Sequence, residues 1–265
     1  MLCKAGFSGT FACAAVMAFS ITTFNAKASE NLDWQGFYGG FALGGMYGAS
    51  NPDSEAQSSG YFSEQSDLDQ LRPGLQEKID GYSASGSGLF GYDHRQGNMI
   101  YGIEADLTVM DYSETSNAGP VTFTSSPTID FSTQTTVKTN FAFSIRPKIG
   151  YAFDNWMIHA AAGPSLSQFK YKFRYVDDNG SGQPVDFDET SWALGLSSNV
   201  GAAYNLGDGW SLRGDYVFNY YPEIVDKSQS FDRFVPLAAA SFTGSFKHEA
   251  DFQSHTIRFG LIKRF

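Results

Sequence analysis

The chain ends in the stretch His255-Thr256-Ile257-Arg258-Phe259-Gly260-Leu261-Ile262-Lys263-Arg264-Phe265. Two sets of side chains alternate along it, the apolar Ile257, Phe259, Leu261 and Phe265 and the polar or small Thr256, Arg258, Gly260 and Arg264. An alternation with period two is typical of a β-strand with one apolar and one polar face. A tilted strand needs about 9–11 residues to cross the hydrocarbon layer of a membrane. The stretch therefore predicts a membrane-crossing final strand that stops on an aromatic residue of its apolar face.

The start of the chain carries the features of an export signal. Lys4 precedes a run of apolar and small residues from Phe7 to Phe24, and Ala26-Lys27-Ala28 follows. A positive start, a short apolar core and a small-residue cleavage site are typical of a secretory signal peptide. We therefore predict a cleaved signal peptide over residues 1–28 and a single barrel domain over residues 29–265. Beyond residue 28 no apolar run reaches about 18 residues, so no membrane-spanning helix is expected.

The composition narrows the class of protein further. The formal net charge is −10, which argues against a nucleic-acid partner because phosphate binding needs basic patches. Aromatic residues make up 16% of the chain, yet the mean hydropathy is negative, at −0.26. This combination is typical of a barrel in which only alternate residues face lipid.

Turn chemistry divides the chain into eight strands. Short stretches with Asn, Asp or Gly at their centres favour tight turns at 91–99, 150–156 and 204–210. Longer polar stretches, interpreted as irregular loops, lie at 49–81, 112–137, 174–187 and 222–251. The predicted strands are 36–48, 81–92, 99–111, 138–152, 156–170, 188–204, 210–221 and 252–265. This pattern predicts an all-β fold, an eight-stranded antiparallel up-and-down transmembrane β-barrel with short periplasmic turns and long extracellular loops.

A soluble barrel with apolar residues inside would show the same alternation. Residue size favours the membrane barrel, because the polar set along the strands is small and the apolar set is bulky. The aromatic residues also gather at predicted strand ends, as they do at membrane interfaces. One such belt contains Trp34, Phe37, Tyr92, Tyr101, Tyr151, Trp156, Tyr204, Trp210 and Phe265, and the other contains Tyr47, Tyr82, Tyr112, Trp192, Tyr220 and Phe252.

Four stretches resemble the small eight-stranded outer-membrane proteins of alphaproteobacteria, a porin-like surface antigen family with the OmpA-type barrel. They are Trp34-Gln35-Gly36-Phe37-Tyr38-Gly39-Gly40, Tyr101-Gly102-Ile103-Glu104-Ala105-Asp106-Leu107, Ile145-Arg146-Pro147-Lys148-Ile149-Gly150-Tyr151-Ala152-Phe153-Asp154 and Trp210-Ser211-Leu212-Arg213-Gly214-Asp215-Tyr216. Pro147 and Lys263 depart from the family pattern. Because Pro147 and Pro164 lack an N–H for the ladder, we expect a bulge or local distortion near them.

The resemblance implies a location in the bacterial cell outer membrane, in contact with outer-membrane lipid and lipopolysaccharide. It also implies that the terminal Phe265 belongs to an assembly signal, which the barrel-assembly machinery reads. Members of the family support envelope integrity. Some are described as porin-like, and some bind haemin or host components through their loops.

A set of charged residues is predicted to face the barrel interior, namely Glu104, Asp106, Arg146, Lys148, Arg213, Asp215 and Arg258. Neighbouring strands place carboxylates opposite cations, and charges in a dry, narrow interior must pair. An eight-stranded barrel has room for little more than side chains, which favours a salt-bridged plug. A gate whose ion pairs rearrange to open a narrow ion path is the alternative.

The predicted loops offer weaker candidates. Residues 49–81 are rich in carboxylates, but the spacing matches no calcium-loop motif, so we expect a solvated acidic loop and no metal site. A short helix over residues 63–71 is compatible with the sequence. The apolar run at 234–240 suits either a partner-binding patch or a segment packed over the barrel mouth. His248 or Tyr61 could ligate haem, but a lone His is weak evidence, and no cofactor is predicted.

Catalysis is not expected. Ser254 and His255 are adjacent on one strand, so their side chains face opposite sides and cannot act together as nucleophile and base. No catalytic residues are therefore predicted. The sequence predicts a structural barrel that supports envelope integrity and displays surface loops. A narrow porin-like channel and a surface receptor for haemin or a host component are the two alternatives.

Overall fold

The computed structural model describes residues 34–179, 182–235 and 238–265. The predicted signal peptide, residues 1–28, lies outside the described residues. The elements are β1 (Gly36–Ser50), β2 (Glu55–Gln57), α1 (Gln65–Leu75), β3 (Ile79–Gln96), β4 (Met99–Thr122), β5 (Asp130–Phe153), β6 (Trp156–Asp177), β7 (Val185–Gly207), β8 (Trp210–Val235) and β9 (Ala240–Arg264). Within these ranges, no helix is long and apolar enough to cross a membrane.

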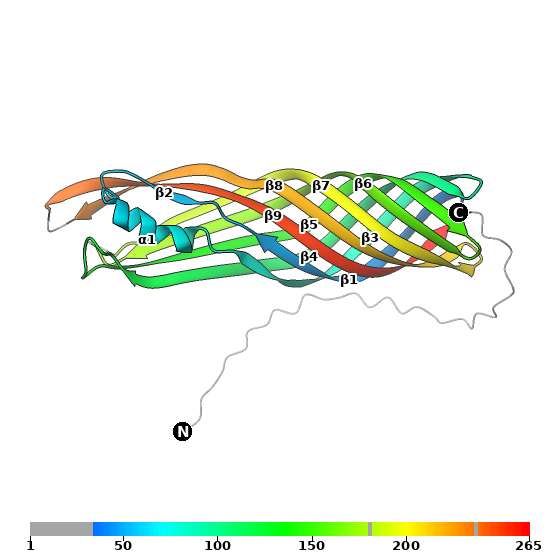
Figure 1. The fold of residues 1–265 in the computed structure, drawn as a ribbon, viewed down its shortest axis with the longest axis horizontal. Helices are drawn as coiled ribbons and strands as arrows, with labels where there is room; N and C mark the ends of the chain where they lie inside the picture. Colours follow the sequence, from blue (N-terminus) through cyan, green and yellow to red (C-terminus); the bar gives the residue numbers. More distant parts are fainter. Residues whose placement is uncertain (1–33, 180–181, 236–237) are drawn as a thin grey trace, which may run out of the picture.

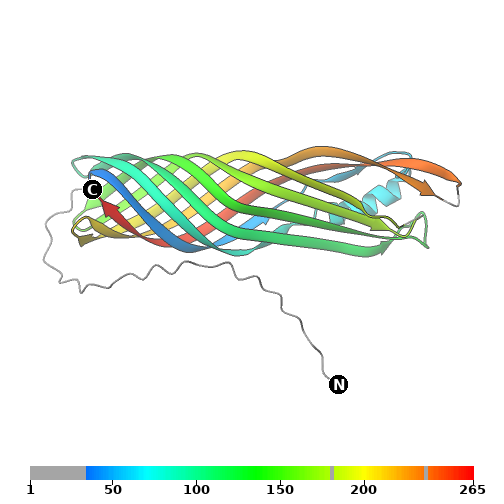
Figure 2. The same cartoon turned by 180° about the vertical axis from the view of Figure 1, so that it is seen from behind.

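The eight long strands close into one antiparallel ring (Figures 1 and 2). β1 and β3 to β9 pair in chain order, and β1 also pairs with β9, which places Phe41 opposite Leu261. The short β2 is added to β9 at the far end of the molecule. This arrangement confirms the predicted eight-stranded antiparallel up-and-down barrel.

Tight turns close the ring at the end where the chain terminates. They lie at residues 97–98, 154–155 and 208–209. Gly97, Asp154 and Asp208 have φ angles of 64°, 47° and 50°. Two-residue hairpin turns need this left-handed backbone, which Gly and Asp adopt at low cost. The predicted short turns are therefore confirmed.

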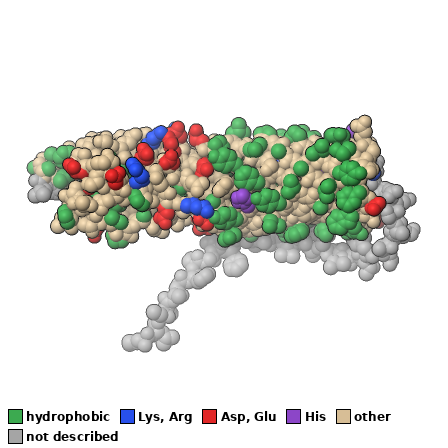
Figure 3. All heavy atoms as spheres, in the orientation of Figure 1, with side chains coloured by type: hydrophobic (Ala, Val, Ile, Leu, Met, Phe, Trp, Pro, Cys, Tyr) green, Lys and Arg blue, Asp and Glu red, His purple; other side chains and the backbone are tan. Residues whose placement is uncertain are grey.

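The half of the barrel next to these turns, which we call the transmembrane zone, is apolar outside and polar inside. In β4, Tyr101 and Ile103 are exposed, whereas Glu104 is buried. In the final strand, Phe259 is exposed and Arg258 is buried, as the alternation predicted. On the face shown in Figure 3, hydrophobic side chains gather on this half, whereas most charged side chains lie on the other half. The outer wall of the transmembrane zone therefore suits contact with lipid.

The other half of the molecule, which we call the head, is built from strand extensions. β4 to β9 continue through most of the stretches 112–137, 174–187 and 222–251. The prediction of irregular loops in these stretches is wrong. Most of their charged residues lie on the outward face of continuing strands, which lowers the mean hydropathy of each stretch without breaking the strand.

Strand β6 shows how the sequence marks the boundary between the two halves. In the transmembrane zone, Ile158 and Leu166 face outward and Ser165 faces inward. In the head, the same inward face carries Phe169, Tyr171, Phe173 and Tyr175, and the outward face carries Lys170, Lys172 and Arg174. Inward and outward residues continue to alternate along β6, but the apolar residues change from the outward to the inward face because the surroundings change from lipid to water.

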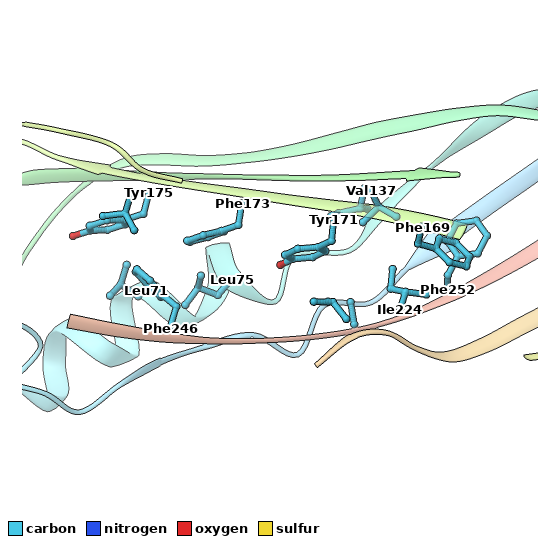
Figure 4. Close-up of a cluster of buried hydrophobic side chains, with 14 of the residues drawn as sticks. Leu71, Leu75, Val137, Phe169, Tyr171, Phe173, Tyr175, Ile224, Phe246 and Phe252 are labelled. Atoms are coloured by element: carbon cyan, nitrogen blue, oxygen red, sulfur yellow. The ribbon is translucent and has the colours of Figure 1, made fainter. Parts of the chain in front are cut away.

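In the head the ring opens into two facing sheets. The last residue pair of β7 and β8 on this side is Leu196 opposite Tyr220. β1 stops at Ser50, and β3 begins opposite it at Ile79, so neither strand continues into the head. One sheet is therefore β4 to β7, and the other is β8 and β9 with β2. Aromatic and aliphatic side chains fill the space between them, as Figure 4 shows. This core gives the head the packing of a folded domain.

Helix α1 closes one side of this core. Leu71 and Leu75 are buried and join the aromatic cluster. The Gln70 amide anchors the helix to the end of β4, donating to the Thr122 carbonyl oxygen at 3.1 Å and accepting from the Thr124 N–H at 2.8 Å. The helix that the sequence allows over 63–71 is thus present, at Gln65–Leu75. Carboxylates of the segment such as Glu64 and Asp69 are exposed, as expected of a solvated acidic stretch, whereas Asp67 is buried.

Pro147 and Pro164 disturb the sheet locally. The β5–β6 ladder is interrupted at residues 145–147 against 162–164, with the same register on both sides. Both prolines fall in this gap, in agreement with their missing N–H groups. The expected local distortion is confirmed, whereas the bulge of this strand pair lies elsewhere, between Thr139 and Ala142.

Candidate functional site

The lumen of the transmembrane zone contains a network of buried charges centred on Glu104. Arg146 Nη2 donates to Glu104 Oε1 at 3.1 Å, and Arg213 donates to both carboxylate oxygens. The Tyr38 hydroxyl donates to Oε2 at 2.8 Å. Glu104 on β4 thus joins guanidinium groups from β5 and β8, two strands that do not pair with each other. The contacts bridge the lumen.

Two further carboxylates extend this network. Asp106 lies 2.6 Å from a guanidinium nitrogen of Arg146 and 2.6 Å from one of Arg258. Asp215 lies 2.9 Å from Arg213 Nε and 3.3 Å from Arg258 Nε. Burying an ion pair is costly, and removing one partner leaves an uncompensated charge that costs more. Each charge in the lumen is therefore tied to its neighbours.

Lys148 forms a second group, nearer the tight turns. Its Nζ lies 2.7 Å from Asp93 Oδ1 and donates to the Tyr38 hydroxyl at 2.8 Å. Arg264 Nη2 lies 2.9 Å from Asp93 Oδ2. Because Tyr38 accepts from Lys148 and donates to Glu104, it connects the two groups.

The structure brings all the predicted interior charges together, namely Glu104, Asp106, Arg146, Lys148, Arg213, Asp215 and Arg258. It adds Tyr38, Asp93, His159 and Arg264, with His159 Nε2 2.9 Å from Asp215 Oδ1. Asp93 falls in the predicted turn at 91–99, where a carboxylate is expected to be solvated. His159 is followed by Ala and Gly residues, so alternation does not show which residues of the predicted strand 156–170 face inward. Arg264 shares the face of Arg258 in the alternation, so strand parity could have identified it.

Apolar side chains close the lumen on both sides of this network. At the turn end, Trp34, Ile100, Ala152, Met157 and Ala203 form a buried cluster, the lower seal. At the head end, the rings of Tyr112, Phe169, Tyr221 and Phe252 form the upper seal, with centroids 5.0 to 6.4 Å apart. The upper seal is continuous with the core of the head.

These seals correct part of the aromatic-belt prediction. Trp34, Tyr112 and Phe252 are each 1% exposed and face the interior. Trp34 precedes β1 and turns into the lumen, whereas Tyr112 and Phe252 lie past the boundary where the inward face becomes apolar. The prediction is confirmed for residues such as Trp156 and Trp192, whose rings are exposed on the outer wall.

The head core encloses His248 of β9. Its ring stacks on Phe187 with centroids 4.5 Å apart and contacts Phe173 at 4.7 Å and Tyr171 at 5.6 Å. Neither ring nitrogen has a hydrogen-bond partner among the described residues. Burial lowers the pKa of His248 to about 4, so the ring is neutral at pH 7. This closed aromatic cage gives no support to haem ligation at the surface through His248.

The other weak candidates are also occupied by structural contacts. The Tyr61 hydroxyl donates to Asp177 at 2.8 Å, and burial raises the pKa of Tyr61. Ser254 is buried, whereas His255 is partly exposed and bonds the Tyr216 hydroxyl at 2.6 Å. Within residues 34–179, 182–235 and 238–265, no group of three or more His, Cys, Asp or Glu side chains could hold a metal ion.

The chain is similar to several solved structures. The chain is similar to the outer membrane protease OmpT from Escherichia coli, with 10% sequence identity, a TM-score of 0.45, and coverage of 87% of this chain and 97% of that chain. It is also similar to OprG from Pseudomonas aeruginosa, with 10% identity, a TM-score of 0.40 and the same coverage of both chains. These values carry no function from those proteins to this one. No curated protein matches the chain.

A sequence-family model gives the stronger result. The model of the outer membrane protein beta-barrel domain matches residues 11–264, a range that includes all the strands of the ring. This match agrees with the apolar outer wall, the closed sheet and the short turns at one end. The protein is therefore located in the bacterial outer membrane, and the chain belongs to the outer membrane protein beta-barrel domain family.

Proposed function

We propose that this protein is a structural, non-catalytic and non-conducting outer-membrane barrel that supports the cell envelope and presents its head outside the cell. The observation that carries the proposal is the filled lumen, in which a buried charge network lies between two apolar seals. An eight-stranded ring leaves an interior that side chains alone can fill. The network then acts as a plug that ties the strands together.

The energetic argument favours the plug over a gate. An ion that crosses the lumen would have to separate pairs such as Glu104 with Arg213, both of which are at most 3% exposed. Breaking a buried pair by removing one partner costs about 3–5 kcal/mol. The ion would also have to pass the Trp34 cluster and the rings of the upper seal, where the Tyr112 and Tyr221 hydroxyls already bond other residues.

Single-channel recording tests this function. The refolded chain from residue 29 is placed in a planar bilayer, beside Glu104→Ala and the double variant Tyr112→Ala/Phe252→Ala, with Arg174→Ala on the head surface as the control. We expect no discrete openings in the unaltered chain or the control, and any conductance only in the lumen variants. Regular openings of the unaltered chain that change in Glu104→Ala would instead identify a pore gated by these charges.

A narrow channel is the second candidate, and one observation favours it. The Asn199 side-chain amide and the Ser85 hydroxyl are buried in the lumen and make no hydrogen bond to the described residues. Buried polar groups are normally satisfied by protein or water. Water in this part of the lumen would lower the barrier to an ion, and the recordings above separate the two cases.

A receptor role is the third candidate. A hollow of about 350 Å³ opens on the head between the start of β7 and the end of β8, where the two strands no longer pair, and Val185, Gln229 and Phe234 are among its lining residues. Haemin is the ligand to try first, by titration of the refolded protein with detection of a Soret shift. We expect no shift, because His248 is enclosed; a saturable shift would favour the receptor.

We also propose that the chain belongs to the alphaproteobacterial surface antigen group, on the strength of the four stretches quoted above. Its partners would be outer-membrane lipid, lipopolysaccharide and the barrel-assembly machinery. Phe265 is 80% exposed and its backbone N–H bonds the Phe37 carbonyl oxygen at 2.9 Å, so an aromatic ring stands free at the seam where β9 closes on β1. This position supports its role as an assembly signal.

A further inference from the structure

A row of hydrogen-bond donors crosses four strands on the outer wall of the barrel. The register places Ser113 opposite Lys138, Lys138 opposite Lys170, and Lys170 opposite Thr190. Directly opposed residues in antiparallel strands lie on the same face of the sheet. Two ammonium groups are therefore flanked by two hydroxyl groups, with Lys172 one step further along the outer face of β6.

This donor row lies just above the transmembrane zone. The boundary is marked by Trp192, which is 60% exposed and packs edge-on against Phe141 with centroids 5.6 Å apart. Trp192 is opposite Gln168 on β6, so Lys170 lies two residues, or about 7 Å, further along the strand. The headgroup layer on each side of a bilayer is roughly 5–8 Å thick. The ammonium groups are thus at the height of the headgroups of the outer leaflet.

The positive charge of the row is incompletely neutralised by the protein. Lys170 Nζ and Lys172 Nζ lie 3.2 and 3.4 Å from the same oxygen, Asp188 Oδ2. Lys138 makes no ion pair with any residue that the structure describes. Arg174, by contrast, has a carboxylate to itself, with bonds of 2.6 and 3.0 Å to Asp186. Like charges directly opposite each other destabilise a sheet, so Lys138 and Lys170 favour an external anion between them.

We propose that Lys138, Lys170 and Lys172, with the Ser113 and Thr190 hydroxyls, bind a phosphate group of an outer-leaflet glycolipid of the lipopolysaccharide type. A phosphate accepts hydrogen bonds from several ammonium and hydroxyl donors at once. The row faces sideways along the leaflet, and it stands out as a local excess of cations on a chain of net charge −10. This assignment deepens the proposed contact with lipopolysaccharide and does not depend on whether the lumen conducts.

Native mass spectrometry of the refolded, detergent-solubilised full barrel tests the proposal with two probes, lipid A carrying its phosphates and chemically dephosphorylated lipid A. The test variant is Lys138→Gln/Lys170→Gln. The matched control is Lys227→Gln/Lys247→Gln, which removes the same charge from β8 and β9. At about 1 kcal/mol per cation near a headgroup, the test variant should bind phosphorylated lipid A about 30-fold more weakly. The control should stay close to the unaltered chain.

The unaltered chain alone gives a second criterion, which does not depend on how well a variant folds. It should prefer phosphorylated over dephosphorylated lipid A, and inorganic phosphate should not release the lipid, because acyl chains add to its affinity. Equal binding of the two lipids, or equal losses in the test and control variants, would overturn the site. Release by stoichiometric inorganic phosphate would make it a free-phosphate site and overturn the lipid assignment. None of these outcomes affects the conductance test.

Discussion

The head should loosen in mild acid because of a single side chain, His248. This ring is fully buried among Tyr171, Phe173, Phe187 and Phe246, with no hydrogen-bond partner for either nitrogen among the described residues. Burial lowers its pKa to about 4, whereas an exposed His titrates near about 6.5. The open head therefore takes up a proton at a higher pH than the closed head does.

The sign and size of the effect follow from this difference. Stability rises with pH wherever the open state binds more protons, so the head loses stability as pH falls from about 6.5 to about 4. One pKa unit corresponds to about 1.36 kcal/mol, so the full loss is about 3.4 kcal/mol, and about 2 kcal/mol is lost by pH 5. Hydrogen bonds from Arg174 lower the pKa of Asp186, the opposite direction from a shift that would add a loss of stability above the usual range of a carboxylate.

Hydrogen exchange of the β9 amides at residues 245–251 measures this loss. After correction for intrinsic exchange rates, protection in the unaltered chain should fall about 30-fold between pH 7 and pH 5. The matched variant His248→Phe keeps an aromatic ring in the cage and removes the titration, so its protection should be nearly independent of pH in this range. An equal fall in both proteins, or no fall in the unaltered chain, would refute the assignment to His248.

Three further perturbations separate the parts of the molecule. Glu104→Ala leaves two buried guanidinium groups short of a partner and should destabilise the barrel by about 3–5 kcal/mol in urea unfolding, whereas the surface control Arg174→Ala should lose much less because its ion pair is exposed to solvent; equal losses would contradict the plug. Leu71→Ala should cost about 2–5 kcal/mol and speed exchange in the head alone, so faster exchange in the transmembrane zone would contradict the division into two halves. Phe265→Ala should lower the amount of assembled barrel in cells but not the refolding yield in detergent; normal assembly would remove its role as a signal.

The fold of the transmembrane zone could be predicted because lipid imposes a simple rule. Every second residue must be apolar, and the turns need Gly, Asn or Asp, so strands such as β4 and β9 and the turn at Asp154 could be placed from the sequence. The head could not be predicted in the same way, because the rule reverses there. The run from Lys170 to Tyr175 alternates regularly between cationic and aromatic residues, with the aromatic residues now inward. Its lysines and arginine are typical of a loop. Only the alternation of inward and outward residues, continued across the boundary, identifies the run as part of a strand.

The lumen network was predictable for a related reason. Charges on the polar face of a strand must be inside, so Glu104, Arg146 and Arg213 could be identified from alternation alone. Tyr38 and Asp93 were missed because a phenol is compatible with either face and a carboxylate near a turn is normally solvated. The charges that meet across the ring come from strands that do not pair with each other. The sequence of any one strand carries no information about the distance between two such strands.

The continuous strands also link the two halves mechanically. Tyr112, Phe169, Tyr221 and Phe252 form the upper seal of the lumen and at the same time the floor of the head core. Protonation of His248 acts first on the rings around it, such as Phe173 and Phe246, which belong to the same core as the upper seal. The ion pairs below them bridge strands of the closed ring and do not depend on the head packing. The barrel should therefore stay plugged while the head opens, so that a change in the head would not make the outer membrane permeable.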